Sequence, residues 1–516
     1  MVGGAPLAVP PAGAAILTPP MDPPGSAPGL PPGALGDVDP EELRRQGHRV
    51  VDWIADYLSG VEALPVRSEQ PPGALRRALP AAPPRQPEPL SEVLDDVDRV
   101  VLPGITHWQS PGFMAYFGIT GSAPGILGEM IAAGLNVNAM LWRTSPAATE
   151  LEEVAVDWLR QLIGLPTGLF GCINDTASSS TLYALAAARE AIPGARIRDL
   201  GMAGRQDLGP LVYYTSEEAH SSVEKAGIVL GTGRAGCRRI TTDPEYRMDV
   251  GALEAAIAED RAAGRVPFAV VATAGTTSTT SVDPVAAIAT VCERERLWLH
   301  VDAAYAGAAA VAPELRWVLD GCERADSVVV NPHKWLFTPI DCSVLYTRRP
   351  TLLRDAFTLV PEYLRTATDG DEAVINLNDY GTSLGRRFRA LKLWMVMRAF
   401  GAEGIAARIR EHVRLGSLLA GWVDEDPGWQ RMAPAPLSTV CLRAHPQGID
   451  AETELERLNA AVMEQVEAGG RYLLSQTRIG NAFSLRVAIG NLRTEERHVR
   501  GLWEALRQAA TSQAGA

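Results

Sequence analysis

The sequence predicts an α/β protein whose central, mostly parallel sheet is covered by helices on both faces. Between about residues 170 and 350, short apolar runs alternate with helical stretches, which is the pattern of such a sheet. Strands buried under helices are apolar on both faces, and four runs have this character: 211–215, 267–273, 297–301 and 328–330. The G-x-G-x-x-G match at 231–236 does not open a helical stretch as a dinucleotide fingerprint would, so we do not expect a dinucleotide site.

From about residue 405 the sequence becomes rich in Arg and Ala, with helical stretches and short strands such as 483–488. This change indicates a smaller C-terminal α/β domain. At the other end, many prolines without a repeat argue against a packed core. We predict four parts: a disordered Pro/Gly/Ala-rich tail at 1–36, an N-terminal helical segment at 37–121, a large domain at 122–404 and a small domain at 405–516. Whether Met1 or Met21 is the true start stays open.

The N-terminal segment begins with a clear helix start. Asp39 is a capping residue, Pro40 suits the first helical position, and acidic residues follow in the first turn. Gly60 is expected to end this helix. One stripe of the helix is apolar and needs a partner surface to bury it; it comprises Leu43, Val50, Val51, Ile54 and Leu58.

Composition excludes several classes of protein. The 516 residues are 46% hydrophobic and 21% charged, which is ordinary for a globular enzyme with a sizeable core. The net charge is −13 and no run is rich in Lys or Arg, so a nucleic-acid partner is not expected. No apolar run reaches the ~18 residues of a membrane span.

We also expect a cytoplasmic protein without a metal site. No basic residue precedes Arg44, so the N-terminus lacks the positive region of a secretory signal. The six cysteines show no Cys-x-x-Cys pair and no metal-ligand spacing, and we interpret them as reduced thiols; they are Cys172, Cys237, Cys292, Cys322, Cys342 and Cys441.

Lys334 is the candidate reactive group. It follows the apolar run 328–330, which stops at Asn331 because Pro332 cannot continue a strand ladder. The next residues are Trp335, Leu336 and Phe337, and partial desolvation by them lowers an amine's pKa and raises its nucleophilic fraction. Such a lysine suits covalent chemistry with an aldehyde cofactor. The alternative is a solvated loop lysine.

A second strand end favours the reactive alternative. The run 297–301 leads directly into Asp302, and ligands of open α/β sheets bind outside the carboxyl ends of strands. Asp302 and Lys334 are therefore expected to face the same crevice. An aspartate there can hold a proton on a pyridine nitrogen, which together with the lysine makes half of a pyridoxal phosphate site. The alternative is a helix cap or a structural ion pair.

Four motifs now carry a family resemblance. They are Asn-Pro-His-Lys-Trp at 331–335, His-Val-Asp-Ala-Ala-Tyr-Ala-Gly at 300–307, Ala-His-Ser-Ser-Val-Glu at 219–224 and Leu-Gly-Arg-Arg-Phe-Arg at 384–389. In order and spacing the chain resembles the pyridoxal-phosphate-dependent group II decarboxylases of the aromatic-L-amino-acid type, over roughly residues 39 to 510. The resemblance implies fold type I, like aspartate aminotransferase, with pyridoxal 5'-phosphate held covalently by Lys334. It also implies a homodimer in which the N-terminal segment packs across the two copies.

The cofactor's phosphate has a candidate site at a helix start. Polar residues at 173–181 precede an alanine-rich helical stretch, and free amides at a helix N-terminus bind anions. The alternative is a plain Ser/Thr cap. The resemblance places the phosphate on five residues: Thr176, Ala177, Ser178, Asn331 and His333.

The resemblance also assigns the surroundings of the cofactor ring. His220 is expected to stack on one face of the ring and Ala304 to pack on the other. Thr277 is a further expected contact, and Asp302 is expected to keep the ring nitrogen protonated. Without the resemblance, His220 would be an ordinary satisfied histidine.

The substrate pocket is expected to be aromatic. By resemblance, Trp108, Tyr116 and Phe117 line the pocket, and aromatic walls suit an aromatic ligand. The alternative for the segment from His107 to Phe117 is a core segment with a turn. Several positions differ from the animal enzymes, so a catechol preference is not carried over. Gly118 and Ile119 stand where the animal enzymes have Pro and Thr, and Asn138 and Met140 stand where those enzymes have Ile and Phe. Gly385 leaves room for a large ring and so favours tryptophan or phenylalanine as the substrate, with tyrosine and DOPA still open.

Tyr363 bears on the product. It matches the tyrosine that the resembled decarboxylases carry on a mobile loop, where phenylalanine would indicate oxidative deamination to an aldehyde. A phenol has a proton to donate to the substrate's α-carbon, and phenylalanine has none. We therefore expect an amine product. The alternative is a tyrosine that merely packs in the loop.

Three other functions stay open at this point. The first is an aromatic acetaldehyde synthase on the same fold. The second is a decarboxylase of a non-aromatic amino acid such as aspartate, glutamate or a diamino acid. The third is a catalytically silent fold kept for protein interaction, which the presence of Lys334, Asp302 and the phosphate loop opposes.

Overall fold

The structure is a computed structural model that describes residues 36–359 and 374–514. The chain forms two compact units. The first holds the described chain up to Tyr57 together with Pro84–Asp95, and the second holds Leu58–Pro83 and the described chain from Asp96 onward. The predicted tail at 1–36 lies outside the described residues except for its last position, and the four predicted domain boundaries stay predictions.

The first unit is built on the predicted N-terminal helix. Helix α1 runs over Pro40–Gly60, and its start is capped as expected, since Asp39 Oδ1 accepts a hydrogen bond from the Glu41 N–H at 2.8 Å. Arg49 joins α1 to α3 (Leu90–Asp96) by donating to the Ser91 carbonyl at 3.2 Å and by pairing with Asp95. The predicted apolar stripe is not fully covered, because Leu43 and Val51 are exposed.

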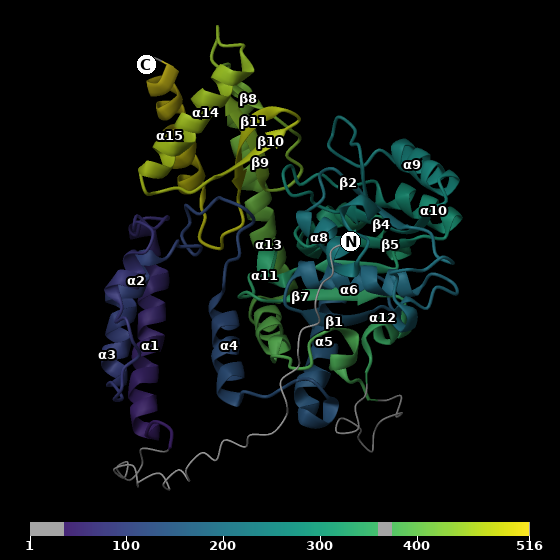
Figure 1. The fold of residues 1–516 in the computed structure, drawn as a ribbon. Helices are drawn as coiled ribbons and strands as arrows, with labels where there is room; N and C mark the ends of the chain where they lie inside the picture. Colours follow the sequence, from purple (N-terminus) through teal and green to yellow (C-terminus); the bar gives the residue numbers. More distant parts are fainter. Residues whose placement is uncertain (1–35, 360–373, 515–516) are drawn as a thin grey trace, which may run out of the picture. The chain divides into compact units, whose positions relative to one another are not determined.

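The second unit contains a seven-stranded sheet in the order β1-β7-β6-β5-β4-β2-β3 (Figure 1). Strand β7 runs in the direction opposite to the other six, so the prediction of a mostly parallel sheet is confirmed. Its strands are β1 Phe170–Asn174, β2 Leu211–Ser216, β3 Cys237–Ile240, β4 Val266–Thr273, β5 Trp298–Asp302, β6 Ser327–Val330 and β7 Ser343–Thr347.

Helices cover both faces of this sheet. Alternate residues of a strand point to opposite faces, and β4 shows the two layers directly. Val270 and Ala272 pack in one buried cluster with α9 (Val250–Ala262) and α10 (Val285–Glu295). Ala269 and Val271 pack in another with α6 (Ala177–Glu190) and α8 (Ser221–Leu230). The strands are therefore apolar on both sides, as the sequence indicated.

The other α-helices of the described chain complete this unit. Helix α13 is interrupted at Gly401, whose φ of 62° suits glycine. The remaining helices are α2 Ala74–Ala78, α4 Ala123–Leu135, α5 Pro146–Leu162, α7 Ile197–Leu200, α11 Pro332–Trp335, α12 Pro350–Phe357, α13 Arg389–Glu425, α14 Glu452–Ala468 and α15 Glu496–Ala514.

The C-terminal part of the second unit forms a smaller α/β layer. Its four-stranded antiparallel sheet has the order β10-β11-β9-β8, and α14, α15 and the end of α13 pack with it around a separate buried cluster (Figure 1). This confirms the predicted small domain. The strands are β8 Trp429–Arg431, β9 Thr439–Ala444, β10 Ser475–Ile479 and β11 Ala482–Ala488.

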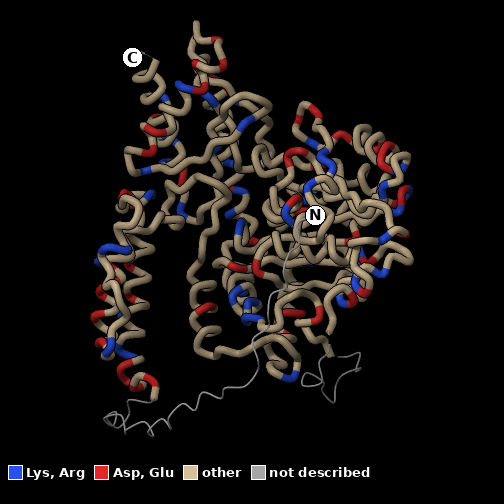
Figure 2. Tube along the Cα trace, in the orientation of Figure 1, with Lys and Arg blue, Asp and Glu red and all other residues tan. Residues whose placement is uncertain are grey.

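Charged side chains are distributed along the whole described chain. Lys and Arg alternate with Asp and Glu in both units (Figure 2), so the net charge of −13 is spread rather than gathered on one element. Among the described residues, no helix is both long and apolar enough to cross a bilayer.

Candidate active site

A cavity of about 480 Å³ opens at the carboxyl ends of β4, β5 and β6. The large sheet contributes Thr273, Asp302 and the residues that follow β6, while the small sheet contributes residues 475–477 of β10 and Arg486 of β11. This is the edge of a parallel sheet where ligands bind. Every residue predicted to hold the cofactor lines this one cavity.

Lys334 enters the cavity from a short helix. Strand β6 ends at Val330, and α11 begins at Pro332, so the proline breaks the strand as the sequence indicated. The Lys334 Nζ atom lies 5.2 Å from the centroid of the Phe117 ring. Removal from water lowers the pKa of Lys334, Asp302 partly opposes that effect, and Arg486 adds to it. The amine is thereby shifted toward its neutral, nucleophilic form.

Asp302 faces the same cavity from the end of β5. It pairs in register with Val329 of β6, is only 6% exposed, and accepts a hydrogen bond from the Ala304 N–H at 3.1 Å. Its carboxylate therefore has one partner in its own turn and an open side toward the cavity. The structure brings Asp302 and Lys334 together as the two strand ends predicted.

The start of α6 has the features of an anion site. Thr176 is the N-cap residue, but its hydroxyl makes no capping hydrogen bond, which argues against the alternative of a plain cap. The Thr176 N–H donates to Asp175 at 2.7 Å. The N–H groups of Ala177 and Ser178 belong to the first helical turn and have no acceptor within the helix. These groups are available to a phosphate.

His333 and Asn331 line the cavity beside that helix start. His333 Nδ1 accepts a hydrogen bond from the Cys342 N–H at 2.9 Å, and burial lowers the pKa of His333 to about 4. The ring is therefore neutral, with its proton on Nε2. That atom lies 3.3 Å from the Asn331 amide, whose Oδ1 is buried without a partner. The oxygen and nitrogen of the Asn331 amide are assigned from their hydrogen bonds, so the amide can be rotated by a half-turn. In that orientation its oxygen accepts the proton of His333 Nε2, and its NH₂ group faces the cavity.

His220, Ala304 and Thr277 complete the predicted ring site. His220 caps α8, with its Nδ1 accepting from the Ser222 N–H at 3.2 Å, and its ring faces the cavity. Burial lowers the pKa of His220, and Asp302 opposes that effect. Ala304 packs with Ala177 in a small buried cluster. All three residues line the cavity, and the contacts with the ring that the resemblance assigned to them stay predictions.

Arg486 is a lining residue that the sequence analysis missed. Its side chain is 4% exposed, its Nε donates to the Ser278 carbonyl at 3.0 Å, and its Nη1 donates to the Tyr116 carbonyl. Its Nη2 is buried without a partner, and its guanidinium lies 4.5 Å from the Phe117 ring centroid. The sequence signal was an arginine inside the mostly apolar strand 483–488, since charged residues are rarely buried without a reason.

The predicted substrate residues fall into two groups. Trp108, Tyr116, Phe117 and Ile119 line the cavity, and the Trp108 and Tyr116 rings stack with centroids 5.8 Å apart. Asn138, Met140 and Gly385 do not line it within this chain.

Asn138, Met140 and Gly385 lie near one another outside the cavity. Asn138 Nδ2 is 3.4 Å from Met140 Sδ, and Asn138 Oδ1 accepts from the Arg386 N–H at 2.9 Å, next to Gly385. Their assignment to the substrate pocket stays a prediction, because none of the three lines the cavity of its own chain. Tyr363 lies outside the described residues, and its role also stays a prediction.

The lining groups fit pyridoxal 5'-phosphate. The cavity combines a lysine of lowered pKa, a carboxylate and a helix start at the carboxyl edge of the sheet. It also holds the buried Thr273 hydroxyl, which lacks a partner in the protein and which a polar ligand can satisfy. In the described part of the chain, no group of three or more His, Cys, Asp or Glu side chains is arranged to hold a metal ion.

Comparison with known proteins agrees with this chemistry. Residues 72–445 match the family described as the pyridoxal-dependent decarboxylase conserved domain. The chain belongs to this family of decarboxylases. Its cofactor is pyridoxal 5'-phosphate and its reaction class is amino-acid decarboxylation.

Similar proteins place the chain in the aromatic amino-acid group of this decarboxylase family. It is 39% identical over 491 residues to tyrosine decarboxylase 1 of Narcissus pseudonarcissus, covering 93% of this chain and 94% of that protein. It is 40% identical over 485 residues to phenylacetaldehyde synthase of Arabidopsis thaliana, covering 92% and 97%. The crystal structure of Oryza sativa TDC with PLP and tryptamine superposes with a TM-score of 0.89 at 38% identity, covering 92% of this chain and 99% of that chain.

We predict that Asp302→Asn shifts the reactivity of Lys334 to lower pH. Asp302 raises the pKa of Lys334 in the wild type, so loss of its charge lowers that pKa, and the neutral amine appears at a lower pH. The measurement is reductive methylation of cofactor-free protein across a pH series, with peptide mass spectrometry of each lysine.

The chain supplies an internal control for this measurement. Its three lysines are Lys225, Lys334 and Lys392, and Lys225 is exposed on α8. The pH profile of Lys225 is expected to be the same in both proteins. An unchanged pH midpoint for Lys334 would contradict the proposed electrostatic coupling to Asp302.

Proposed function

We propose that this decarboxylase converts an aromatic L-amino acid, namely tryptophan, phenylalanine, tyrosine or DOPA, to the corresponding amine and CO₂. The observation that carries the proposal is the lining of the cavity, which combines Lys334, an aromatic wall and the buried Arg486, whose Nη2 has no partner. An aromatic amino acid has the matching parts: an amine-bearing carbon, an aromatic side chain and a carboxylate.

The lining residues divide the catalytic tasks. When bound, pyridoxal phosphate supplies an electron sink for the electrons left behind as CO₂ departs. Lys334 holds the cofactor covalently, for which its lowered pKa is favourable. Asp302 keeps a proton on the ring nitrogen, and His220 and Ala304 enclose the ring from its two faces. Thr176, Ala177, Ser178, Asn331 and His333 hold the phosphate, and Thr277 adds a contact.

Arg486 is proposed to orient the substrate's carboxylate. Its Nη2 has no partner in the protein, and a buried guanidinium without an anion is costly. A carboxylate in the cavity gives it the missing acceptor. Hydrogen bonds to charged groups contribute about 1.5–3 kcal/mol. Fixing the carboxylate also fixes which bond of the α-carbon lies in the geometry for cleavage.

The aromatic wall selects the side chain. Trp108, Tyr116 and Phe117 offer ring faces and edges, and aromatic pairs contribute about 0.5–1.5 kcal/mol beyond area burial. Gly385 does not line the cavity of its own chain, so the preference for tryptophan or phenylalanine that it suggests requires a second copy, and tyrosine and DOPA remain in the proposed set. A decarboxylase for an acidic or diamino substrate is the weaker alternative, because this mainly aromatic wall offers a charged side chain no oppositely charged partner.

Tyr363 supports the amine over the aldehyde product. The similar proteins include both a tyrosine decarboxylase and a phenylacetaldehyde synthase. Membership of the family therefore does not decide between an amine and an aldehyde product. A tyrosine at this position has a phenolic proton that can return to the α-carbon. The aldehyde route is the second candidate function.

We propose a homodimer as the working assembly. Exposed apolar side chains occur on α1 at Leu43 and on α4 at Leu127 and Ile131, and such surface favours association. A second copy also offers a way for Asn138 and Met140 to reach a substrate pocket that they do not line in their own chain. Sedimentation of the purified protein tests this assembly.

The direct test of the function is product analysis. The protein with pyridoxal phosphate is incubated with the common amino acids plus DOPA and 5-hydroxytryptophan, and all products are identified by mass spectrometry. Aromatic amines are the expected products. Aldehydes with peroxide would select the synthase, and β-alanine, GABA or a diamine would overturn the aromatic assignment.

Tyr363→Phe is predicted to divert product from amine to aldehyde. The substitution removes only the hydroxyl, and with it the proton donor. Amine and aldehyde are quantified together with peroxide for both proteins. An unchanged amine yield in the variant would remove Tyr363 from the mechanism.

Arg486→Leu is predicted to raise KM for the amino acid by about 10- to 150-fold, which corresponds to the loss of one charged hydrogen-bonding partner. Inhibition by the aromatic amine, which lacks a carboxylate, should be nearly the same in variant and wild type. Arg478→Leu, on the neighbouring strand with its side chain 54% exposed, is the matched control. A KM that does not change, or an equal loss of amine binding, would contradict a carboxylate role for Arg486.

A further inference from the structure

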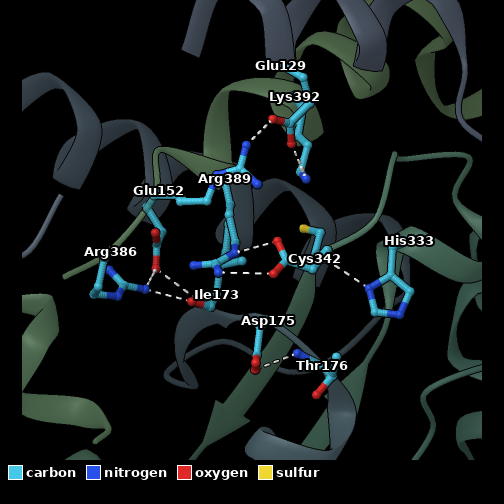
Figure 3. A network of polar contacts seen from close by, with 12 residues as sticks. Glu129, Glu152, Ile173, Asp175, Thr176, His333, Cys342, Arg386, Arg389 and Lys392 are labelled. Atoms are coloured by element: carbon cyan, nitrogen blue, oxygen red, sulfur yellow. Dashed lines mark hydrogen bonds and ion pairs between the residues drawn. The ribbon is translucent and has the colours of Figure 1, made fainter. Parts of the chain in front are cut away.

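The segment 384–389 carries three arginines that go to three different places. Arg386 and Arg389 turn into the protein toward the two walls of the proposed phosphate site (Figure 3), whereas Arg387 pairs with Glu129 of α4. We propose that Arg386 and Arg389 are positioning residues that hold these two walls in register for the cofactor's phosphate. This inference rests on the proposed assignment of that phosphate site.

Arg389 acts on the wall that carries His333. Its Nε and Nη2 donate to the two carboxylate oxygens of Asp341 at 2.8 and 3.1 Å, which is the bidentate geometry that fixes both groups. The next residue after Asp341 is Cys342, whose N–H donates to His333 Nδ1. Arg389 thus fixes the peptide that decides which ring nitrogen of His333 carries the proton.

The charge state of Asp341 agrees with this arrangement. Burial raises the pKa of Asp341, but the hydrogen bonds and the charge of Arg389 outweigh burial and leave that pKa below its ordinary value. The carboxylate therefore stays ionised and keeps both hydrogen bonds. His333 in turn presents its Nε2 proton to Asn331 and the cavity.

Arg386 acts on the opposite wall. Its Nη2 donates to Glu152 Oε1 at 2.8 Å and to the Ile173 carbonyl at 2.6 Å, and the same Glu152 oxygen accepts from the Ile173 N–H at 2.8 Å. Both backbone groups of Ile173 are therefore clamped by one ion pair. Ile173 lies in β1 shortly before Thr176, where the first turn of α6 begins.

The energetics argue for positioning rather than bulk stability. The side chains of Arg386 and Glu152 are 8% and 2% exposed, and a buried ion pair often gives no more stability than apolar residues of the same size. What such a pair does supply is a fixed geometry. Here it fixes the strand end from which the phosphate loop leaves.

The two walls come from strands that are not neighbours in the sheet. The loop at Thr176 follows β1, Asn331 and His333 follow β6, and β7 lies between these strands. The two strands share no ladder with each other, and the sheet connects them only through β7, which pairs with both. Arg386 and Arg389 belong to one short segment, so they link the loops through the Glu152–Ile173 and Asp341–Cys342 contacts.

The test is the affinity of the full-length, cofactor-depleted protein for two ligands, pyridoxal 5'-phosphate and pyridoxal. Arg386→Met and Arg389→Met are each expected to weaken pyridoxal phosphate binding by about 10- to 100-fold, the usual effect of removing a group that orients direct ligands. Pyridoxal lacks the phosphate, so its affinity should stay near the wild-type value. Arg387→Met, from the same segment, should leave both affinities unchanged.

Two further variants keep the test decisive if a methionine variant does not fold. Asp341→Asn preserves shape but removes the charge that holds Arg389, and it should give the same selective loss. Arg389→Lys keeps the charge without the bidentate fork, and its affinity should lie between those of wild type and Arg389→Met. The effects of Arg389→Met and Asp341→Asn should not add in the double variant, since both act through one contact.

Two results would overturn the proposal. One is pyridoxal phosphate affinity within about twofold of wild type in both arginine variants, well below the expected effect. The other is an equal loss for the two ligands, which indicates general damage to the fold. Because the readout is cofactor affinity and not turnover, a wrong substrate assignment leaves this test unaffected, whereas a phosphate bound elsewhere makes it fail.

Discussion

Lys334 needs a neutral amine for its covalent chemistry, and desolvation at the end of β6 supplies that condition. Pro332 ends the strand and starts α11, so the lysine is delivered into a cavity instead of continuing the ladder. Burial lowers its pKa, and the charge of the Asp302 carboxylate partly opposes that effect. The charge of Asp302 and the nearby Phe117 ring partly offset the cost of burying the ammonium form of this lysine.

The small domain is as necessary to the site as the sheet. It contributes Arg486, whose guanidinium is held by the Ser278 and Tyr116 carbonyls and lies over the Phe117 ring. The Phe117 ring stacks on Tyr305 at 3.9 Å, and Tyr305 stacks on Trp335 at 4.6 Å. Beside Lys334, Trp335 donates to His412 of α13 at 2.8 Å. Packing of large rings thus ties the cavity wall to the long helix that leads into the small domain.

Much of this site was predictable from the sequence, because its parts are local. Proline after an apolar run ends a strand wherever it occurs, and runs such as 267–273, apolar on both faces, indicate buried parallel strands. Lys334 and Asp302 follow two such runs. Once the sheet is parallel, their strand ends share one edge, and the structure places both in one cavity.

The rest depends on contacts between distant residues, which no local pattern encodes. In the sequence, Arg486 is a polar residue in a short predicted strand. Its place in the cavity wall follows only from the position of the small sheet beside the cavity. The antiparallel direction of β7 is set by its pairing with β1 and β6, not by its own residues. Arg386 and Arg389 appeared only as part of a motif, and their separate partners emerge from the fold. Asn138, Met140 and Gly385 were assigned to a pocket that one copy of the chain does not bring them to.

The most direct test of the central claim is to reduce the cofactor-loaded protein with borohydride and locate the added cofactor mass by peptide mass spectrometry. The chain has three lysines, so each outcome is distinct. We predict the modification on Lys334, with none on exposed Lys225 or on Lys392, which is paired with Glu129. Cofactor on either of those lysines, or the release of all cofactor unmodified after reduction, would contradict Lys334 as the reactive centre.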